Sequence, residues 1–257
     1  MYIENTIHKD NFEKNGYVII DNNLENNQNF EKITQEINLN LKLQLKDNNL
    51  KNISGYLMGN LGINQGQYGL KLYSIIFKEE FIKIFENLTE IDLNSFDINY
   101  GGNLVLPKKG QQHFHIDGFF NKKMYLVSIA TEDVTLQNGP TEVCIGSHKN
   151  QMKYWEFFLS KKNKKKILLK KGQILIRKHN LWHRGTRNNS NQARLLLSFI
   201  MTPKINANEI EPLTSNIKIL PNFFKPGFLG KIQEILYVNF RTIHLILKII
   251  NSIIKQK

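Results

Sequence analysis

Residues 111–120, with the sequence QQHFHIDGFF, place imidazole and carboxylate side chains two residues apart. A strand sends alternate side chains to opposite faces, so His113, His115 and Asp117 would share one face. A His and an Asp at this spacing supply two ligands of the two-His, one-carboxylate triad, which binds non-haem Fe(II) and leaves coordination positions open. We therefore expect this segment to be a strand that holds a metal ion.

Residues 181–199 offer a third ligand and a cation. His183 lies far enough along the chain from His115 for a strand-rich fold to bring the two together. Arg194 then opens an apolar run at residues 195–197. A guanidinium at the start of a buried strand is costly unless an anion meets it, and its planar fork fits a carboxylate through two hydrogen bonds. The two segments together predict iron and a dicarboxylate co-substrate.

At these residues the chain resembles the phytanoyl-CoA dioxygenase family of Fe(II)- and 2-oxoglutarate-dependent oxygenases. The resemblance covers about residues 10–203. It rests on four segments in a fixed order, which are FEKNGYVII at 12–20, HFHID at 113–117, NGPTEVCIGSHK at 138–149 and KKGQILIRKHNLWHRGTRN at 170–188. Each segment is a weak signal alone, and their order and spacing make the resemblance specific.

The resemblance implies that His115, Asp117 and His183 bind iron and that Arg194 binds the distal carboxylate of 2-oxoglutarate. It also implies a mainly β fold with flanking helices, the double-stranded β-helix or cupin-like jelly roll. Many members carry a Ser two residues after the second His, as another contact to that carboxylate. Here the position is Gly185, so co-substrate binding is expected to differ in this detail.

The chemistry that the resemblance implies is oxidation of a small molecule by O2, with 2-oxoglutarate converted to succinate and CO2. Related halogenases replace the carboxylate ligand with a small residue that leaves room for chloride, so Asp117 favours hydroxylation. Desaturation, epimerisation and ring closure stay open. The substrate also stays open, since the family acts on fatty acyl-CoA, osmolytes, antibiotics and sugars.

Composition narrows the class of protein. A chain of 257 residues suffices for one sizeable domain. Cys144 is the only cysteine, which excludes an intramolecular disulfide and suits a reducing compartment. The first residues lack a basic region followed by an apolar run, so we expect a cytoplasmic protein without a secretory signal. No uninterrupted apolar stretch has the length of a membrane-spanning helix.

The net charge of +13 raises the question of an anionic partner. Lys, Asn and Ile are all abundant, as expected when the base composition of a genome favours A and T, and no nucleic-acid recognition motif accompanies the lysines. We therefore do not expect nucleic-acid binding, although an anionic or lipid-linked substrate fits the charge. The lysine cluster at 161–166 is interpreted as a surface loop, with phosphate steering as the alternative.

Two parts are expected along the chain, a jelly roll at 1–203 and an appendage at 204–257. Four of the six prolines lie at 203–227, which indicates an extended linker. An amphipathic helix is predicted at 228–257, and it packs on its own domain, on a partner subunit or on a membrane surface. The oligomeric state stays open. The apolar stripe of the predicted helix comprises Ile232, Ile235, Leu236, Ile243, Ile246, Ile250 and Ile253. The basic residues of this helix are Arg241, Lys248, Lys255 and Lys257.

Periodicity predicts the remaining elements. Residues 46–70 carry five glycines and are interpreted as an irregular connection, with a substrate lid as the alternative. Helices are expected at 10–16, 30–45 and 77–88, and strands at 17–20, 96–100, 103–106 and 124–131.

Four other polar residues need an assignment. His113 is expected behind the metal ligands or facing substrate, and Asn103 is either a co-substrate contact or a plain strand residue. His148 fits a structural turn, and His179 lies in a turn where it would not reach the metal.

Two other classes of protein compete with the enzyme. The first is a metal-free jelly-roll binding module, in which Arg194 would lack an anion. The second is a basic protein that binds a membrane surface or nucleic acid, which would show salt-dependent binding and indifference to iron. Three metal ligands and a co-substrate arginine in the correct order favour the oxygenase.

Overall fold

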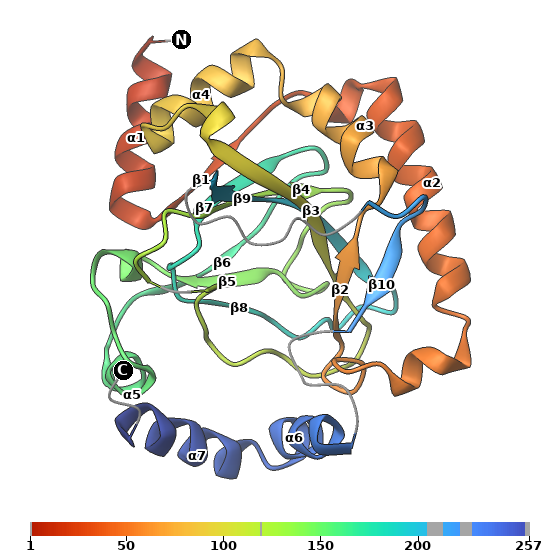
Figure 1. Ribbon diagram of the computed structural model, residues 1–257, viewed down its shortest axis with the longest axis vertical. Helices are drawn as coiled ribbons and strands as arrows, with labels where there is room; N and C mark the ends of the chain where they lie inside the picture. Colours follow the sequence, from red (N-terminus) through yellow and green to blue (C-terminus); the bar gives the residue numbers. More distant parts are fainter. Residues whose placement is uncertain (1, 119, 205–212, 222–227, 255–257) are drawn as a thin grey trace.

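The computed structural model describes residues 2–118, 120–204, 213–221 and 228–254. Its centre is a pair of antiparallel sheets (Figure 1). The large sheet has the spatial order β1 (Tyr17–Ile20), β7 (Ile174–Lys178), β4 (Tyr125–Ala130), β9 (Arg194–Pro203), β3 (Phe96–Val105), β2 (Asn60–Asn64) and β10 (Lys218–Leu220). The small sheet has the order β6 (Lys164–Ile167), β5 (Thr141–Cys144) and β8 (His183–Gly185). The expected mainly β jelly roll is confirmed.

The strand β9 occupies the middle of the large sheet, between β4 and β3. Its sequence RLLLSFIMTP is apolar on both faces because helices cover one side and the small sheet and a cavity cover the other. A ten-residue antiparallel register with β3 runs from Phe96 opposite Pro203 to Val105 opposite Arg194. The register therefore sets Arg194 at the beginning of β9, where the two sheets approach each other.

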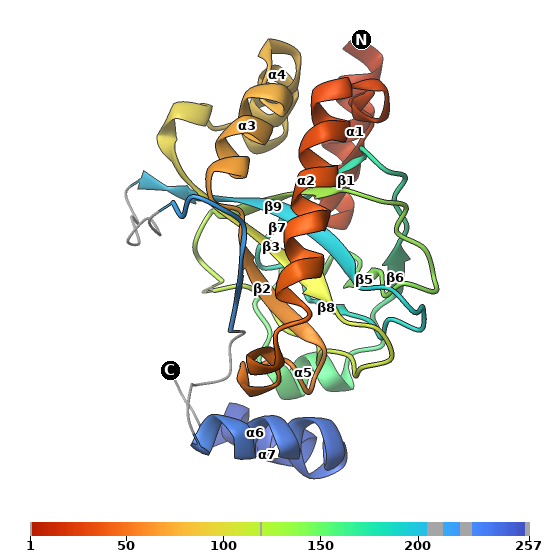
Figure 2. The same ribbon diagram turned by 90° about the vertical axis from the view of Figure 1, so that its right-hand side faces the viewer.

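Four helices pack on the large sheet, on the side away from the small sheet (Figures 1 and 2). They are α1 (Tyr2–Asn15), α2 (Gln28–Gln44), α3 (Gln67–Ile76) and α4 (Glu79–Thr89). The side chain of Asn27 caps α2 by accepting the N–H groups of Asn29 and Phe30. The buried ring of Phe85 on α4 meets Phe96 of β3 edge to face at 5.7 Å between centroids. These contacts fix the position of the large sheet, whose other face carries residues of the site.

Three helices lie at the far end of the molecule, at the bottom of Figure 1, and are α5 (Tyr154–Leu159), α6 (Phe228–Asn239) and α7 (Arg241–Ile254). The helix predicted at 228–257 is thus two helices, which meet at Phe240. Residues 205–212, 222–227 and 255–257, with part of the predicted linker and with Lys255 and Lys257, lie outside the described residues. No helix in the described part of the chain is both long enough and apolar enough to cross a membrane.

The glycine-bearing residues 46–70 are more regular than expected. They contain β2, which pairs with β3, and the beginning of α3. Leu61 and Ile63 of β2 are buried, but the glycines around them hide this short alternation in the sequence. The two strands predicted at 96–106 are one strand, β3, because Gly101 and Gly102 continue the ladder. Short 3-10 helices complete the fold at Leu24–Asn26, Asn48–Asn52, Leu93–Ser95 and Ser147–Lys149.

Candidate metal and co-substrate site

His115 and Asp117 follow β3 on an extended segment that borders β8. The expected regular strand at 111–120 is not formed, because the segment makes only a single bridge, between His115 and His183. His115 and His183 exchange backbone hydrogen bonds of 2.9 Å in both directions. The N–H of Asp117 donates to the carbonyl of His179 at 3.0 Å. These bonds still hold the segment extended, so that His115 and Asp117 point the same way, as predicted.

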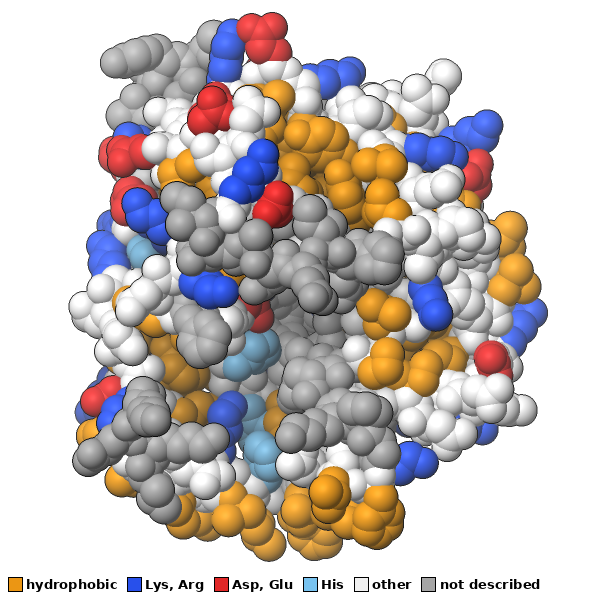
Figure 3. Space-filling view, in the orientation of Figure 1, with side chains coloured by type: hydrophobic (Ala, Val, Ile, Leu, Met, Phe, Trp, Pro, Cys, Tyr) orange, Lys and Arg blue, Asp and Glu red, His pale blue; other side chains and the backbone are white. Residues whose placement is uncertain are grey.

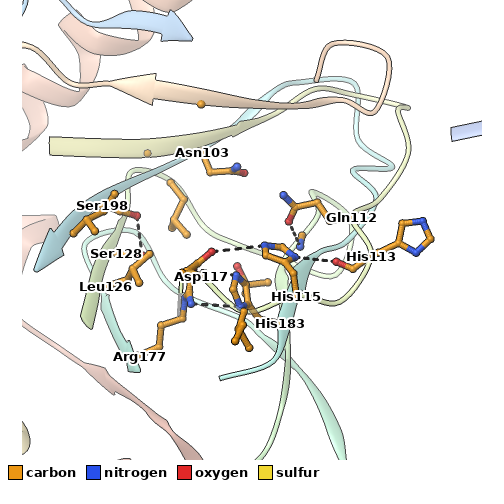
Figure 4. A pocket seen from close by; sticks show the side chains of 18 of the residues that line it. Asn103, Gln112, His113, His115, Asp117, Leu126, Ser128, Arg177, His183 and Ser198 are labelled. Carbon is orange, nitrogen blue, oxygen red and sulfur yellow. Dashed lines mark hydrogen bonds and ion pairs between the residues drawn. The ribbon is translucent and has the colours of Figure 1, made fainter. Parts of the chain in front are cut away.

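The structure brings the three predicted metal ligands together (Figure 4). One ligand atom from each of His115, Asp117 and His183 lies within 4.8 Å of the others. The Nε2 atoms of His115 and His183 lie 3.8 and 3.5 Å from the carboxylate oxygens of Asp117. Each ring turns its Nδ1 atom to a backbone carbonyl at 2.9 Å, that of His113 or of Leu181. Because Nδ1–H donates to this carbonyl, Nε2 keeps its lone pair for a metal ion.

The protonation states of the three side chains suit a metal ion. Burial lowers the pKa of both His115 and His183, so each imidazole is neutral near pH 7. Burial alone would raise the pKa of Asp117, but the neighbouring His183 and the guanidinium of Arg177 outweigh it and hold that pKa below its ordinary value. Two neutral imidazoles and one carboxylate form the donor set that non-haem Fe(II) prefers. The residues present therefore fit the metal that the sequence predicts.

Arg177 is a neighbour of this cluster that sequence reasoning missed. It lies on β7, its side chain is 8% exposed, and its Nη2 donates to Oδ2 of Asp117 at 2.6 Å. The guanidinium thus neutralises and orients the carboxylate from behind. The signal in the sequence was an arginine inside the apolar run ILIRK, where a buried cation requires an anionic partner.

Arg194 is fully buried at the beginning of β9 and lines the same cavity. Its Nη2 donates to the carbonyl of Gly139 at 2.5 Å, whereas Nε and Nη1 have no hydrogen-bond partner. Burial lowers the pKa of this guanidinium to about 10, against the opposing charge of Glu132. Within the described residues no carboxylate forms an ion pair with it. A buried cation with two free N–H donors fits an anionic ligand such as the distal carboxylate of 2-oxoglutarate.

Gly185, the departure from the family pattern, has a local cause. Its N–H donates to Oε1 of Gln112 at 2.7 Å. A Cβ atom at Gly185 would lie 3.0 Å from that oxygen and 2.9 Å from Nδ2 of Asn60. The amide of Gln112, which also lines the cavity, thus lies where a serine side chain would otherwise stand. Gln112 is therefore a polar cavity residue that the sequence did not single out.

The cavity that contains these residues has a volume of about 1040 Å³. Histidine side chains lie in the hollow of the face shown in Figure 3. The predicted neighbours Asn103 and His113 both line it, and α6 and α7 form its wall opposite the sheets. His148 lies in the short 3-10 helix Ser147–Lys149, with Nε2 3.1 Å from the carbonyl of Glu13, and His179 turns to the carbonyl of Met124. Neither of these last two belongs to the metal cluster, as expected.

Comparisons with known proteins agree with this geometry. The family model described as phytanoyl-CoA dioxygenase matches residues 12–196. No curated protein matches the chain significantly.

Several solved structures share the fold. The epimerase SnoN from nogalamycin biosynthesis, in complex with Fe3+, alpha ketoglutarate and nogalamycin RO, has a TM-score of 0.62 at 14% identity, over 79% of this chain and 85% of that one. AviO1 from Streptomyces viridochromogenes Tue57 has a TM-score of 0.59 at 12% identity, over 82% and 98%. EctD from S. alaskensis with 2-oxoglutarate and 5-hydroxyectoine has a TM-score of 0.57 at 13% identity, over 83% and 84%. At these identities the likeness concerns the fold alone.

Proposed function

We propose that this chain, which belongs to the phytanoyl-CoA dioxygenase family, is an Fe(II)- and 2-oxoglutarate-dependent oxygenase that hydroxylates a small molecule. One observation carries the proposal. The cluster of His115, Asp117 and His183 shares a single cavity with Arg194, a buried cation that has free donors. The iron would supply activation of O2, coupled to conversion of 2-oxoglutarate to succinate and CO2.

The residues of this chain would divide the work. His115, Asp117 and His183 would hold Fe(II), and the backbone carbonyls behind both rings would keep each Nε2 directed at it. Arg177 would keep Asp117 ionised and oriented. Arg194 would bind the distal carboxylate of 2-oxoglutarate and so fix the co-substrate in the cavity. The three-residue ligand set leaves positions open for co-substrate and O2.

Hydroxylation is the outcome that Asp117 supports, because the carboxylate fills the position that halogenases open to chloride. Solved structures of this fold nevertheless include an epimerase and a carbocyclase. A substrate screen that detects succinate release, followed by mass spectrometry of the product, separates the outcomes. Hydroxylation adds one oxygen atom to the product. A product of unchanged mass would indicate epimerisation instead. A product lighter by two hydrogens would indicate desaturation or ring closure.

The cavity also supports an anionic substrate. Lys248 of α7 lines it, donates to the carbonyl of Phe114 at 3.3 Å and lies 4.1 Å from the ring centroid of Tyr154. Among the described residues no carboxylate forms an ion pair with Lys248. Nε2 of His113 and Nδ1 of His244, on side chains of the same cavity, are buried without hydrogen-bond partners. A carboxylate or phosphate group on the substrate would satisfy these three side chains.

Lys248→Met is expected to lower kcat/KM for an anionic substrate by about 10- to 100-fold, because one charge-assisted hydrogen bond is lost. Burial lowers the pKa of Lys248 to about 8. In the wild type, kcat/KM for the anionic substrate should therefore fall as pH rises through 8 and Lys248 loses its charge. Steady-state kinetics on matched substrates with and without the anionic group measure both effects. Lys231→Met, at an exposed lysine of α6 outside the cavity, is the control. Equal losses on the uncharged substrate would contradict this role.

A further inference from the structure

The helices α6 and α7 carry large apolar side chains on their outer sides, where an ordinary surface helix is polar. Lys248 and His244 of α7 face the cavity, and Glu234 of α6 is buried and accepts the N–H of Met58 at 3.0 Å. Leu236 and Tyr237 line the cavity and Leu245 and Ile249 pack inward, but ten other large apolar side chains face outward. On α6 and α7 and at their junction these are Phe228, Leu229, Ile232, Ile235, Phe240, Ile243, Ile246, Leu247, Ile250 and Ile253, which are 38–78% exposed.

The helix α5 enlarges this surface. It packs against α7, and its last two side chains, Phe158 and Leu159, are 51% and 70% exposed. We call these twelve outward side chains of α5, α6 and α7 the apolar face. In Figure 3 hydrophobic side chains follow the lower edge of the molecule, where Figure 1 places α6 and α7. Single exposed apolar residues are common, but twelve on three neighbouring helices mark an interaction surface.

The charges beside the apolar face are mostly positive. The lysine cluster at 161–166 follows α5 directly, and its exposed members are Lys161, Lys164, Lys165 and Lys166. Lys164 lines a small cavity together with Arg241 and Leu245 of α7, which places the cluster beside that helix. The acidic residues of the three helices are only Glu156, which binds the N–H of Lys153, and the buried Glu234.

An apolar stripe bordered by lysines matches an anionic lipid surface, into which the isoleucines would insert while the lysines contact headgroups. A second copy of the chain fits less well, because a two-fold interface places the same patch on both sides and would bring lysines close to lysines. We propose that the apolar face binds peripherally to the surface of an anionic lipid bilayer. Leu247 belongs both to this face and to the cavity wall, so binding would hold the cavity at the membrane surface.

Sedimentation of the full chain with vesicles tests the proposal. We expect binding to vesicles of phosphatidylcholine with 30% phosphatidylglycerol, weaker binding to pure phosphatidylcholine, and a decrease with added salt. The variant Ile243→Gln/Ile246→Gln/Ile250→Gln should lower vesicle affinity by at least about tenfold, because the inserted apolar area is lost. These residues lie outside the cavity lining. The control is Leu39→Gln/Leu43→Gln/Leu70→Gln, which changes equally exposed leucines on α2 and α3.

A second variant, Lys161→Gln/Lys165→Gln/Lys166→Gln, should remove the preference for anionic vesicles and keep the weak binding to neutral ones. Fe(II) binding should be the same in all variants, so this test is independent of the proposed reaction. Absence of vesicle binding by the wild type would overturn the proposal. A lipid-free dimer that the isoleucine variant dissociates, measured by light scattering, would assign the face to a second copy instead.

Discussion

Arg194→Met is expected to raise the dissociation constant for 2-oxoglutarate by about 100- to 1,000-fold, since two charge-assisted hydrogen bonds to a carboxylate contribute about 3 to 4 kcal/mol. Fe(II) binding alone should not change, because Arg194 does not belong to the metal cluster. Calorimetric titration of 2-oxoglutarate into the anaerobic Fe(II)-loaded protein measures the effect. Arg187→Met, at an exposed arginine of the same region, is the matched control.

The same variant separates a binding role of Arg194 from a structural one. In the ligand-free protein its guanidinium is buried with two unused donors, and replacing an unpaired buried cation by an apolar side chain removes its desolvation cost. We therefore expect ligand-free Arg194→Met to be at least as stable as the wild type in urea unfolding. A large loss of stability would show that Arg194 serves the fold.

Asp117→Ala should strongly weaken Fe(II) binding and also destabilise the ligand-free protein. It removes the carboxylate of the metal cluster and leaves Arg177 buried without its ion pair. We expect the free energy of unfolding to fall by about 2 to 3 kcal/mol, less than for a fully buried pair because the Asp117 side chain is 32% exposed. Metal analysis after anaerobic loading and urea unfolding provide the two measurements.

The double variant Asp117→Ala/Arg177→Met identifies the cause of the stability loss. If the unpaired guanidinium destabilises Asp117→Ala, its removal should restore most of the lost free energy of unfolding while Fe(II) binding stays weak. A double variant that is less stable than Asp117→Ala would show that Arg177 stabilises the protein through contacts other than the ion pair.

The chemistry of the site was readable in the sequence because it depends on residue types in a fixed order. His115, Asp117, His183 and Arg194 were singled out by spacing, and the structure brings them into one cavity. The element that carries two of them was predicted as a strand, yet its backbone makes a single bridge. The side chains of His115 and Asp117 still point the same way, because individual hydrogen bonds keep this segment extended without a continuous ladder.

The roles of Arg177 and Gln112 and the orientation of α6 and α7 depend on contacts between distant segments, so no local sequence pattern predicts them. Arg177 of β7 forms an ion pair with Asp117 on the segment after β3, and the side chain of Gln112 on that segment accepts the N–H of Gly185 of β8. The orientation of α6 and α7 was equally hidden. Their isoleucine stripe predicts an apolar side but not its direction, and buried polar anchors such as Glu234 and Lys248 turn that side outward.

The central claim is that one cavity binds Fe(II) and 2-oxoglutarate together. Anaerobic titration of the metal-free protein with Fe(II) and then 2-oxoglutarate, followed by visible absorption, tests it most directly. We predict the weak charge-transfer band of the iron chelate in the wild type, and a much weaker band at the same concentrations in Arg194→Met and in Asp117→Ala. A wild-type protein that shows no band at any concentration of either ligand would contradict the assignment and favour a metal-free binding protein.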